Sequence, residues 1–213
     1  MIETVKKGNI NICRLVLGSV RTNTYIVYGN TGECFVVDPA DESDIIKIKL
    51  TDLNLTVKAI LLTHGHFDHI GGADALRKAY GAVIYAFNDE KQILESCENN
   101  LSSVFGSGFT LKADKWLSDN EKINIAGMDI QVIHTPGHTI GSVCYLVSSQ
   151  GEKILISGDT LFCGSCGRYD FPTGSYGMII KSIKERLLVL DEKLAVYPGH
   201  NEETTIGQEK IYY

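Results

Sequence analysis

The 213-residue chain has 44% hydrophobic and 22% charged residues, as is usual for a globular protein of one large domain or two small ones. Residues 1–20 lack the order of a signal peptide, and no apolar run reaches the roughly 18 residues of a membrane span, so we expect a cytoplasmic protein. The net charge of −6, without a cluster of lysines and arginines, argues against a nucleic-acid partner. The sequence does not indicate an oligomeric state.

Short apolar runs alternate with helical patterns from one end of the chain to the other. Strands are predicted at residues 24–28, 34–37, 57–63, 82–87, 122–125, 128–133, 142–147, 153–157 and 193–196. Helices are predicted at 42–53, at 73–80, around 89–97, and over a later segment with Ile179, Ile183, Leu187 and Leu190 on one face. Strands with interspersed helices predict a layered α/β architecture.

Four of the apolar strands lead into a glycine-containing turn that carries a histidine or a carboxylate. The candidate residues are His64, His66, Asp68 and His69 after the first of these strands, then His138, Asp159 and His200 after the other three. Because sheets place ligand sites beyond the ends of their strands, we expect the four turns to converge on one pocket.

The spacing within residues 64–69 favours metal binding over packing. His64 and His66 lie two positions apart, so in an extended segment both imidazoles can bind one ion. Asp68 and His69 follow where the chain turns into a helix, and that turn can aim them at a second ion. We therefore expect a two-metal hydrolase that holds a hydroxide between its ions, with zinc foremost and iron or manganese as alternatives.

The remaining histidine and the six cysteines are not expected to bind these metal ions. His134 ends a strand without a turn of its own, so we expect a structural or supporting role. Cys163 and Cys166 have the spacing of a redox or zinc pair, but no second pair completes a zinc site, and a redox role stays open. The remaining cysteines are expected to be small buried hydrophobic residues; they are Cys13, Cys34, Cys97 and Cys144.

The candidate metal-binding residues and their order along the chain resemble the motifs of the metallo-β-lactamase superfamily. The matching positions are Asp38, the His-x-His-x-Asp-His cluster at 64–69, His138, Asp159 after a glycine, and the final His200. The resemblance implies one domain over residues 1–213, folded as a four-layer αββα sandwich with the site along one edge of its two sheets. It further implies one metal on His64, His66 and His138, another on Asp68, His69 and His200, Asp159 as the bridge, and Asp38 as a residue that orients a ligand.

Within that superfamily the chain looks most like the glyoxalase II-type hydrolases and their compact bacterial members. The segments that carry this likeness are 135–139, 158–162, 164–172 and 198–200. It implies hydrolysis of a small-molecule thioester of the S-lactoylglutathione type, with Asp68 orienting the hydroxide. Arg168 either holds a substrate carboxylate or forms a surface salt bridge. Longer members hold glutathione with a C-terminal helical region, whereas this chain ends at Tyr213, so the acyl group and the thiol carrier stay open.

Four other functions fit parts of this pattern. The main alternative is a mononuclear-iron persulfide dioxygenase of the same superfamily, in which the resemblance implies His64, His138 and Asp159 as ligands. His200 after Pro-Gly, and Pro172 after Phe171, favour the hydrolase. Asp159 argues against a true β-lactamase, which generally has another residue there. The complete metal pattern disfavours a non-catalytic scaffold, and Phe67 stands where a flavin-linked di-iron reductase usually has an acid.

Overall fold

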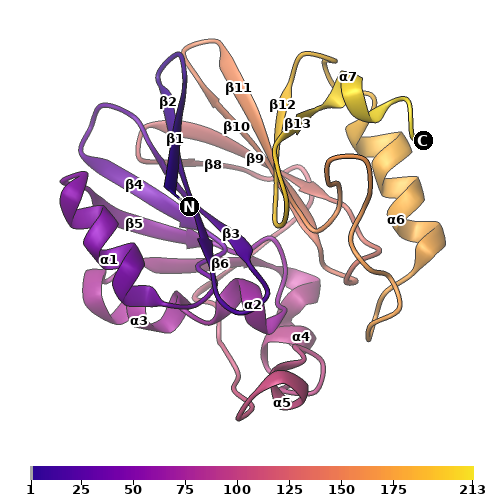
Figure 1. The fold of residues 1–213 in the computed structure, drawn as a ribbon, viewed down its shortest axis with the longest axis horizontal. Helices are drawn as coiled ribbons and strands as arrows, with labels where there is room; N and C mark the ends of the chain where they lie inside the picture. Colours follow the sequence, from indigo (N-terminus) through magenta and orange to yellow (C-terminus); the bar gives the residue numbers. More distant parts are fainter. Residues whose placement is uncertain (1) are drawn as a thin grey trace.

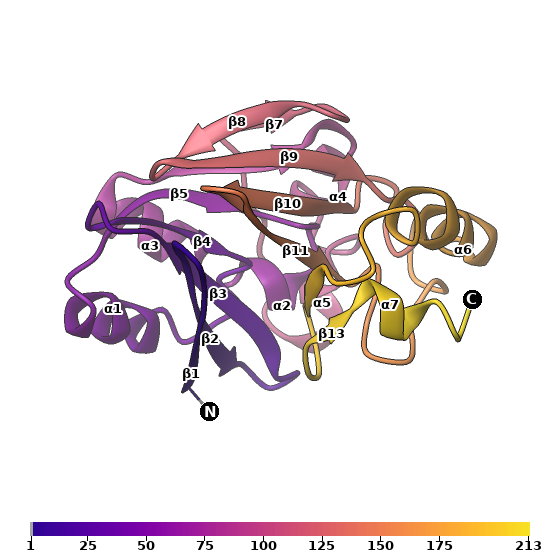
Figure 2. The same cartoon turned by 90° about the horizontal axis from the view of Figure 1, so that it is seen from above.

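The computed structural model describes residues 2–213, with side chains from Thr4 onward, and its strands form two sheets packed face to face (Figures 1 and 2). Within those residues, the first sheet has seven strands in chain order: β1 (Ile2–Lys7), β2 (Ile10–Leu17), β3 (Thr22–Tyr28), β4 (Glu33–Val37), β5 (Thr56–Leu61), β6 (Val83–Phe87) and β7 (Lys115–Leu117). The pairs from β1 to β4 are antiparallel, and those from β4 to β7 are parallel.

The second sheet is mostly antiparallel. Its spatial order is β13-β12-β11-β10-β9-β8, and its strands are β8 (Lys122–Ile125), β9 (Met128–His134), β10 (Val143–Ser149), β11 (Glu152–Gly158), β12 (Ala195–Pro198) and β13 (Thr204–Thr205). Only the β11–β12 pair runs parallel among the described strands of this sheet. Both β11 and β12 therefore end on the same side, which brings the turns after them together.

Helices cover the outer faces of both sheets. On the first sheet these are α1 (Ser43–Asp52) and α3 (Ala73–Tyr80), while α2 (Phe67–Ile70), a 3₁₀ turn (Asn88–Glu90), α4 (Lys91–Leu94) and α5 (Ser102–Phe105) lie toward one end of the sheet. On the second they are α6 (Tyr176–Ser182), a π-helical continuation (Ile183–Leu187) and α7 (Ile206–Glu209). Within residues 2–213, no helix has the length and apolar content that crossing a membrane requires.

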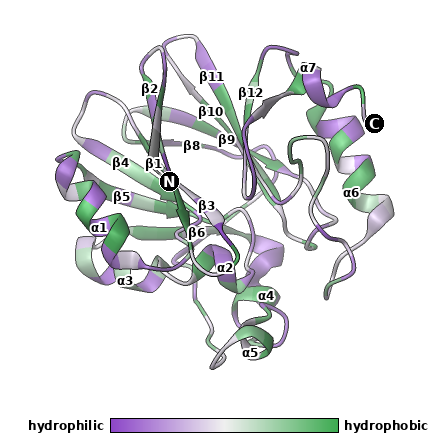
Figure 3. Ribbon diagram, viewed as in Figure 1, coloured by the Kyte–Doolittle hydropathy of each residue, from purple (hydrophilic) through white to green (hydrophobic). Residues whose placement is uncertain are grey.

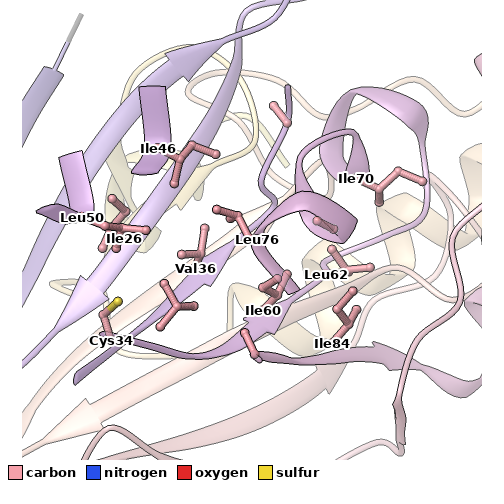
Figure 4. Packing of buried hydrophobic residues seen from close by; sticks show 14 of the residues in the cluster. Ile26, Cys34, Val36, Ile46, Leu50, Ile60, Leu62, Ile70, Leu76 and Ile84 are labelled. Atoms are coloured by element: carbon pink, nitrogen blue, oxygen red, sulfur yellow. The ribbon is translucent and has the colours of Figure 1, made fainter. Parts of the chain in front are cut away.

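Strand alternation divides the buried side chains among three layers. In β4, Phe35 and Val37 point into the core between the sheets, while Cys34 and Val36 face α1 and α3 (Figure 4). A third core lies between the second sheet and α6. Figure 3 shows the matching pattern on α1, whose apolar residues alternate with polar ones along the helix. The predicted four-layer α/β sandwich is thus confirmed.

Some predicted elements differ from the structure at their ends. The strand predicted at 57–63 ends at Leu61, and the helix predicted around 89–97 is a 3₁₀ turn followed by one α-helical turn that ends at Leu94. Ser96 accepts a hydrogen bond from the Asn99 amide, and the Asn99 side chain donates to the Gln92 carbonyl. These local side-chain bonds compete with helix continuation.

Other elements were not predicted. β1 and β2 were not predicted because polar and charged residues interrupt their apolar runs, Glu3 in β1 and Asn11 and Arg14 in β2, and β7 and β13 are too short to give a pattern. The predicted helical face around residue 179 is present, but the helix widens to a π turn, with the Leu188 amide donating to the Ile183 carbonyl at 2.9 Å. Leu190 therefore lies beyond the helix, half-buried.

Candidate metal centre

All seven candidate ligands lie directly after the ends of β5, β9, β11 and β12, and the fold brings them together. His64 and His66 occupy the extended segment after β5, and Asp68 and His69 lie in α2. His138, Asp159 and His200 follow the other three strands. The sequence separation within the group exceeds one hundred residues, so the sheet topology and not local chain geometry assembles it.

The first group consists of three buried imidazoles. The Nε2 atom of His138 lies 2.9 Å from His66 Nδ1 and 3.2 Å from His64 Nε2. A neutral imidazole carries one N–H, so three ring nitrogens that face one point share few protons among them. Donor atoms around a tetrahedral zinc at about 2.0–2.1 Å are themselves separated by about 3.3 Å. The donor set therefore fits a divalent cation.

The second group combines a carboxylate with two imidazoles. Asp68 Oδ2 lies 3.4 Å from His69 Nε2 and 3.4 Å from His200 Nε2. Although fully buried, His69 Nε2 has no hydrogen-bond partner anywhere in residues 2–213. Such an orphaned atom costs about 1–3 kcal/mol, and a cation at this position would supply the missing partner.

Asp159 faces both groups at once. Its Oδ1 atom lies 3.4 Å from His69 Nε2, and its Oδ2 atom lies 3.4 Å from His200 Nε2 and 3.6 Å from His138 Nε2. Gly199 allows this approach, because a Cβ atom there would collide with Asp159 Oδ1 and lie 2.8 Å from His69 Cε1. One carboxylate can thus contact cations in both groups.

The two groups differ in protonation when no metal is bound. Burial, with help from the neighbouring imidazoles, lowers the pKa of His64 well below its usual value and that of His66 to about 3. Burial also opposes charge on His69 and His200, but Asp68 and Asp159 outweigh it and raise their pKa values to about 9 and 10. The first group is therefore neutral at pH 7, and the second holds protons that a cation must displace.

Asp38 supports the second group from behind. Its Oδ2 atom accepts hydrogen bonds from His69 Nδ1 at 2.9 Å and from the Thr63 hydroxyl at 2.6 Å, and its Oδ1 atom accepts from the Thr63 amide at 2.8 Å. Both oxygens of the carboxylate therefore accept hydrogen bonds, and the bond from Nδ1 fixes the orientation of the His69 ring.

Two supporting residues were missed from the sequence. Buried Glu90 accepts hydrogen bonds from the Gly65 amide at 2.7 Å, the Gly141 amide at 3.0 Å and the Thr139 hydroxyl. It therefore ties the loop that carries His64 and His66 to the loop that carries His138. Thr22 donates to Asp68 Oδ2 at 2.7 Å. Neither residue has a sequence signal, because an acid beside Asp89 and a threonine in a strand are ordinary surface and sheet residues.

His134 and Arg168 lie near the centre without joining it. The His134 ring stacks on Phe87 with centroids 4.3 Å apart, and its Nε2 lies 2.9 Å from the Ile140 carbonyl. The exposed guanidinium of Arg168 pairs with Asp170 at 2.8 Å and lies 4.2 Å over the ring of Phe171. The Arg168 carbonyl also accepts a hydrogen bond from His138 Nδ1 at 2.6 Å.

All six cysteines fall in the described part of the chain, and all are free thiols. Cys13, Cys34 and Cys144 are buried as expected, whereas Cys97 is half-buried beside Glu98. The prediction of a buried Cys97 was wrong, because the helix predicted around it ends at Leu94. Of the two cysteines after β11, Cys163 is exposed and Cys166 is half-buried, and they form no disulfide with each other.

Comparison with known proteins agrees with this geometry. The chain is 31% identical over 204 residues to hydroxyacylglutathione hydrolase GloC of Haemophilus influenzae, covering 94% of this chain and 95% of that one. A solved structure titled BLEG-1 B3 metallo-beta-lactamase is 38% identical, with a TM-score of 0.87 and 93% and 95% of the two chains covered. TTHA1623, solved in a di-iron-bound form, is 30% identical, with a TM-score of 0.79 and 92% and 96% covered.

The family assignment rests on a match that spans most of the chain. A model described as the Metallo-beta-lactamase superfamily matches residues 17–200. That range contains Asp38, both proposed ligand groups and Asp159. The chain therefore belongs to the metallo-beta-lactamase superfamily, as a hydrolase with a cluster of histidines and aspartates suited to metal.

Proposed function

We propose that this protein is a binuclear metal-dependent hydrolase of thioesters of the S-lactoylglutathione type. The observation that carries the proposal is Asp159, whose two oxygens face two separate groups of buried ligand atoms. A two-metal site of this kind suits the addition of water to a carbonyl. The named activity of the Haemophilus influenzae relative supports a thioester substrate.

The proposed ligands divide as the two groups do. His64, His66 and His138 would hold one cation, Asp68, His69 and His200 the other, and Asp159 would contact both. Two divalent cations at these positions would polarise the thioester carbonyl and lower the pKa of a bound water. Zinc is the proposed metal because imidazole and carboxylate ligands suit it; the di-iron form of TTHA1623 makes iron the competing identity.

The chain's own residues would then position water and substrate. Asp68 stays ionised, because although burial opposes its charge, His69, His200 and Thr22 together hold its pKa below the usual range. We propose that Asp68 orients the attacking water. Water adds to the carbonyl carbon, the C–S bond breaks, and the products are an acid and a thiol. Arg168, which lies over the ring of Phe171 and so near His66, is proposed to contact an anionic part of the substrate.

β-Lactam hydrolysis is a second candidate, favoured by the 38% identity to the BLEG-1 structure. Both reactions add water to an acyl carbon, so the same centre could serve either. Asp159 favours the thioester, because a true β-lactamase generally has another residue at this position. Persulfide oxidation on a single iron held by His64, His138 and Asp159 would leave the second group of Asp68, His69 and His200 without a cation, so we rank it below the hydrolases.

Metal analysis and substrate assays separate these functions. Purified protein should contain about two zinc ions per chain and hydrolyse S-lactoylglutathione, with activity lost in His66→Ala. One iron per chain with oxygen uptake on a persulfide, and no thioester turnover, would overturn the proposal. Turnover of a β-lactam alone would replace it with the second candidate.

We also propose a single domain and a cytoplasmic location. Both sheets share one central core, to which β2, β4, β9 and β11 all contribute. Free cysteines fit a reducing compartment. Limited proteolysis that released a separately folded half would contradict the single domain.

A further inference from the structure

A cluster of three phenylalanines lies beside the second ligand group. Phe67, the first residue of α2 and the neighbour of Asp68, stacks on Phe105 of α5, with ring centroids 5.0 Å apart and planes at 16° (Figure 2). Phe105 is 59% exposed, and Phe109, in the loop after α5, is 39% exposed. Large apolar side chains that gather at the surface beside a polar centre, unlike single scattered ones, indicate a binding surface.

Buried hydrogen bonds hold the loop that carries these rings. The Phe67 amide donates to the Asn100 carbonyl at 2.8 Å, and Asn100 Nδ2 donates to the Phe109 carbonyl at 2.7 Å. The Ser102 hydroxyl donates to the same carbonyl at 2.9 Å and accepts from the Phe109 amide at 2.8 Å. Asn100 and Ser102 are both buried. The backbone of Phe109 is therefore fixed by polar contacts, and its ring stays available to a ligand.

A cavity of about 140 Å³ lies between this cluster and the turn after β2. Phe67 and Phe109 line it together with Gly18 of that turn, whose amide donates to Glu42 Oε2 at 2.9 Å. The cavity also reaches Asp68, the carboxylate of the second ligand group. Its walls are thus held in place on both sides, and one end of it touches the proposed metal centre.

We propose that this cavity binds the acyl group of the substrate, and that the preferred acyl group is apolar and about the size of a phenyl ring. The inference rests on the proposed thioester hydrolysis and adds to it the class of acyl group and the residues that select it. Asp68 is the residue proposed to orient the attacking water, so the carbonyl carbon must lie close to it. The substituent on that carbon then lies next to the cavity that Asp68 lines.

The size of the cavity limits its occupant to one substituent. Sites that enclose a whole small molecule measure about 300–1,000 Å³, well above the 140 Å³ found here. An apolar cavity of about 150 Å³ holds one benzene ring. The methyl group of a lactoyl substrate would leave most of the space unfilled, and the wall atoms would lose the contacts that a larger apolar group provides.

The charge of the cavity selects against an acidic acyl group. Asp41, which is not one of the proposed ligands, lines the cavity with its exposed side chain. Within residues 2–213, the side chains that line it include no lysine or arginine. A second carboxylate on the acyl group would therefore be repelled without a compensating partner. We expect a phenyl or short alkyl group and not the acyl group of a dicarboxylic acid.

Two matched pairs of substrates test this preference in the metal-loaded protein. S-mandeloylglutathione differs from S-lactoylglutathione only by a phenyl ring in place of the methyl group. Its kcat/KM, corrected for the rates of spontaneous hydrolysis, should be at least tenfold higher. S-pentanoylglutathione should likewise be cleaved more efficiently than S-glutarylglutathione, which has the same chain length and a terminal carboxylate. Equal values within the first pair would overturn the proposal.

Variants at Phe109 assign the preference to the cavity. Asparagine and leucine have similar sizes, so Phe109→Asn and Phe109→Leu differ mainly in polarity. Phe109→Asn should lower the ratio of mandeloyl to lactoyl kcat/KM at least fivefold, whereas Phe109→Leu should keep most of it. The control Val189→Ala shortens a 69% exposed apolar side chain beyond the π-helical segment and should leave the ratio unchanged. An unchanged ratio in Phe109→Asn, or an equal loss in Phe109→Leu, would overturn the role of this cavity.

A binding measurement separates the cavity from the reaction. The probe is 3-phenylpropanamide, which has a phenyl ring but neither a thioester nor a carboxylate. Saturation-transfer NMR with the metal-loaded protein should show contact with the phenyl protons, and the signal should fall at least fivefold in Phe109→Asn but not in Val189→Ala. Probe binding without cleavage of any thioester would reject the proposed function and leave the apolar cavity standing. Thioester cleavage with no probe binding and no mandeloyl preference would overturn the acyl site alone.

Discussion

Glu90 provides the sharpest test of how the first ligand group is held. Its carboxylate accepts three hydrogen bonds, one from Gly65 between His64 and His66, and two from the loop that follows His138. Glu90→Gln keeps the size of the side chain but replaces one oxygen by an NH₂ group, which cannot accept. At least one donor of the two histidine loops therefore loses its partner.

The expected effect follows from the number of lost bonds. One hydrogen bond to a buried charged group contributes about 1.5–3 kcal/mol, which corresponds to about 10- to 100-fold in metal affinity if the bond serves to hold the loops. Burial raises the pKa of Glu90 to about 7, so the acid form, which resembles the amide, predominates below that pH. The difference in metal affinity between wild type and Glu90→Gln should therefore be small at pH 6 and reach its full size above pH 8.

Competition titration with a chromophoric chelator measures both affinities in the metal-free protein. Only the affinity of the first group should fall in Glu90→Gln. Glu209→Gln is a matched control, since Glu209 is also a buried acid and accepts hydrogen bonds from Thr204 and Gly164. Native affinity in Glu90→Gln at pH 8, or an equal loss in both variants, would refute the reasoning.

Three further predictions concern Gly199, the second ligand group and Arg168. Gly199→Ala should lower activity about 100-fold with unchanged circular dichroism, because its Cβ would displace Asp159; a loss of less than tenfold would contradict this. Filling the second group at pH 7 should release about two protons, since His69 and His200 have pKa values raised to about 9 and 10, and fewer than one at pH 10; indicator dye in weak buffer counts them. Arg168→Gln should raise KM two- to threefold for substrates with a carboxylate, because an exposed ion pair is weakened by water and salt; an unchanged KM would remove the proposed contact.

The fold class and the cluster of histidines and aspartates could be predicted because each leaves a local pattern. The unbroken apolar run of β4 is a consequence of burial on both faces, and the i, i+4 spacing of Ile46 and Leu50 in α1 is a consequence of burial on one face. Five of the six histidines follow strand ends and meet in the structure. His134 is itself the last residue of β9 and packs on Phe87, because it precedes the turn that carries His138 toward the centre.

The supporting contacts could not be predicted, because they depend on pairs of segments that only the folded sheets bring together. Glu90 lies 25 residues from Gly65 and 51 from Gly141, and nothing in its own neighbourhood marks it as buried. Its burial is decided by two glycines, since a Cβ at Gly65 would lie 2.9 Å from Glu90 Oε2 and one at Gly141 would lie 2.6 Å from the Glu90 amide. In the sequence these glycines look like ordinary turn residues, but in the fold they also leave room for the Glu90 carboxylate to reach both histidine loops. Ligands can thus be identified by residue type and spacing, whereas the residues that hold them in place are identified by packing.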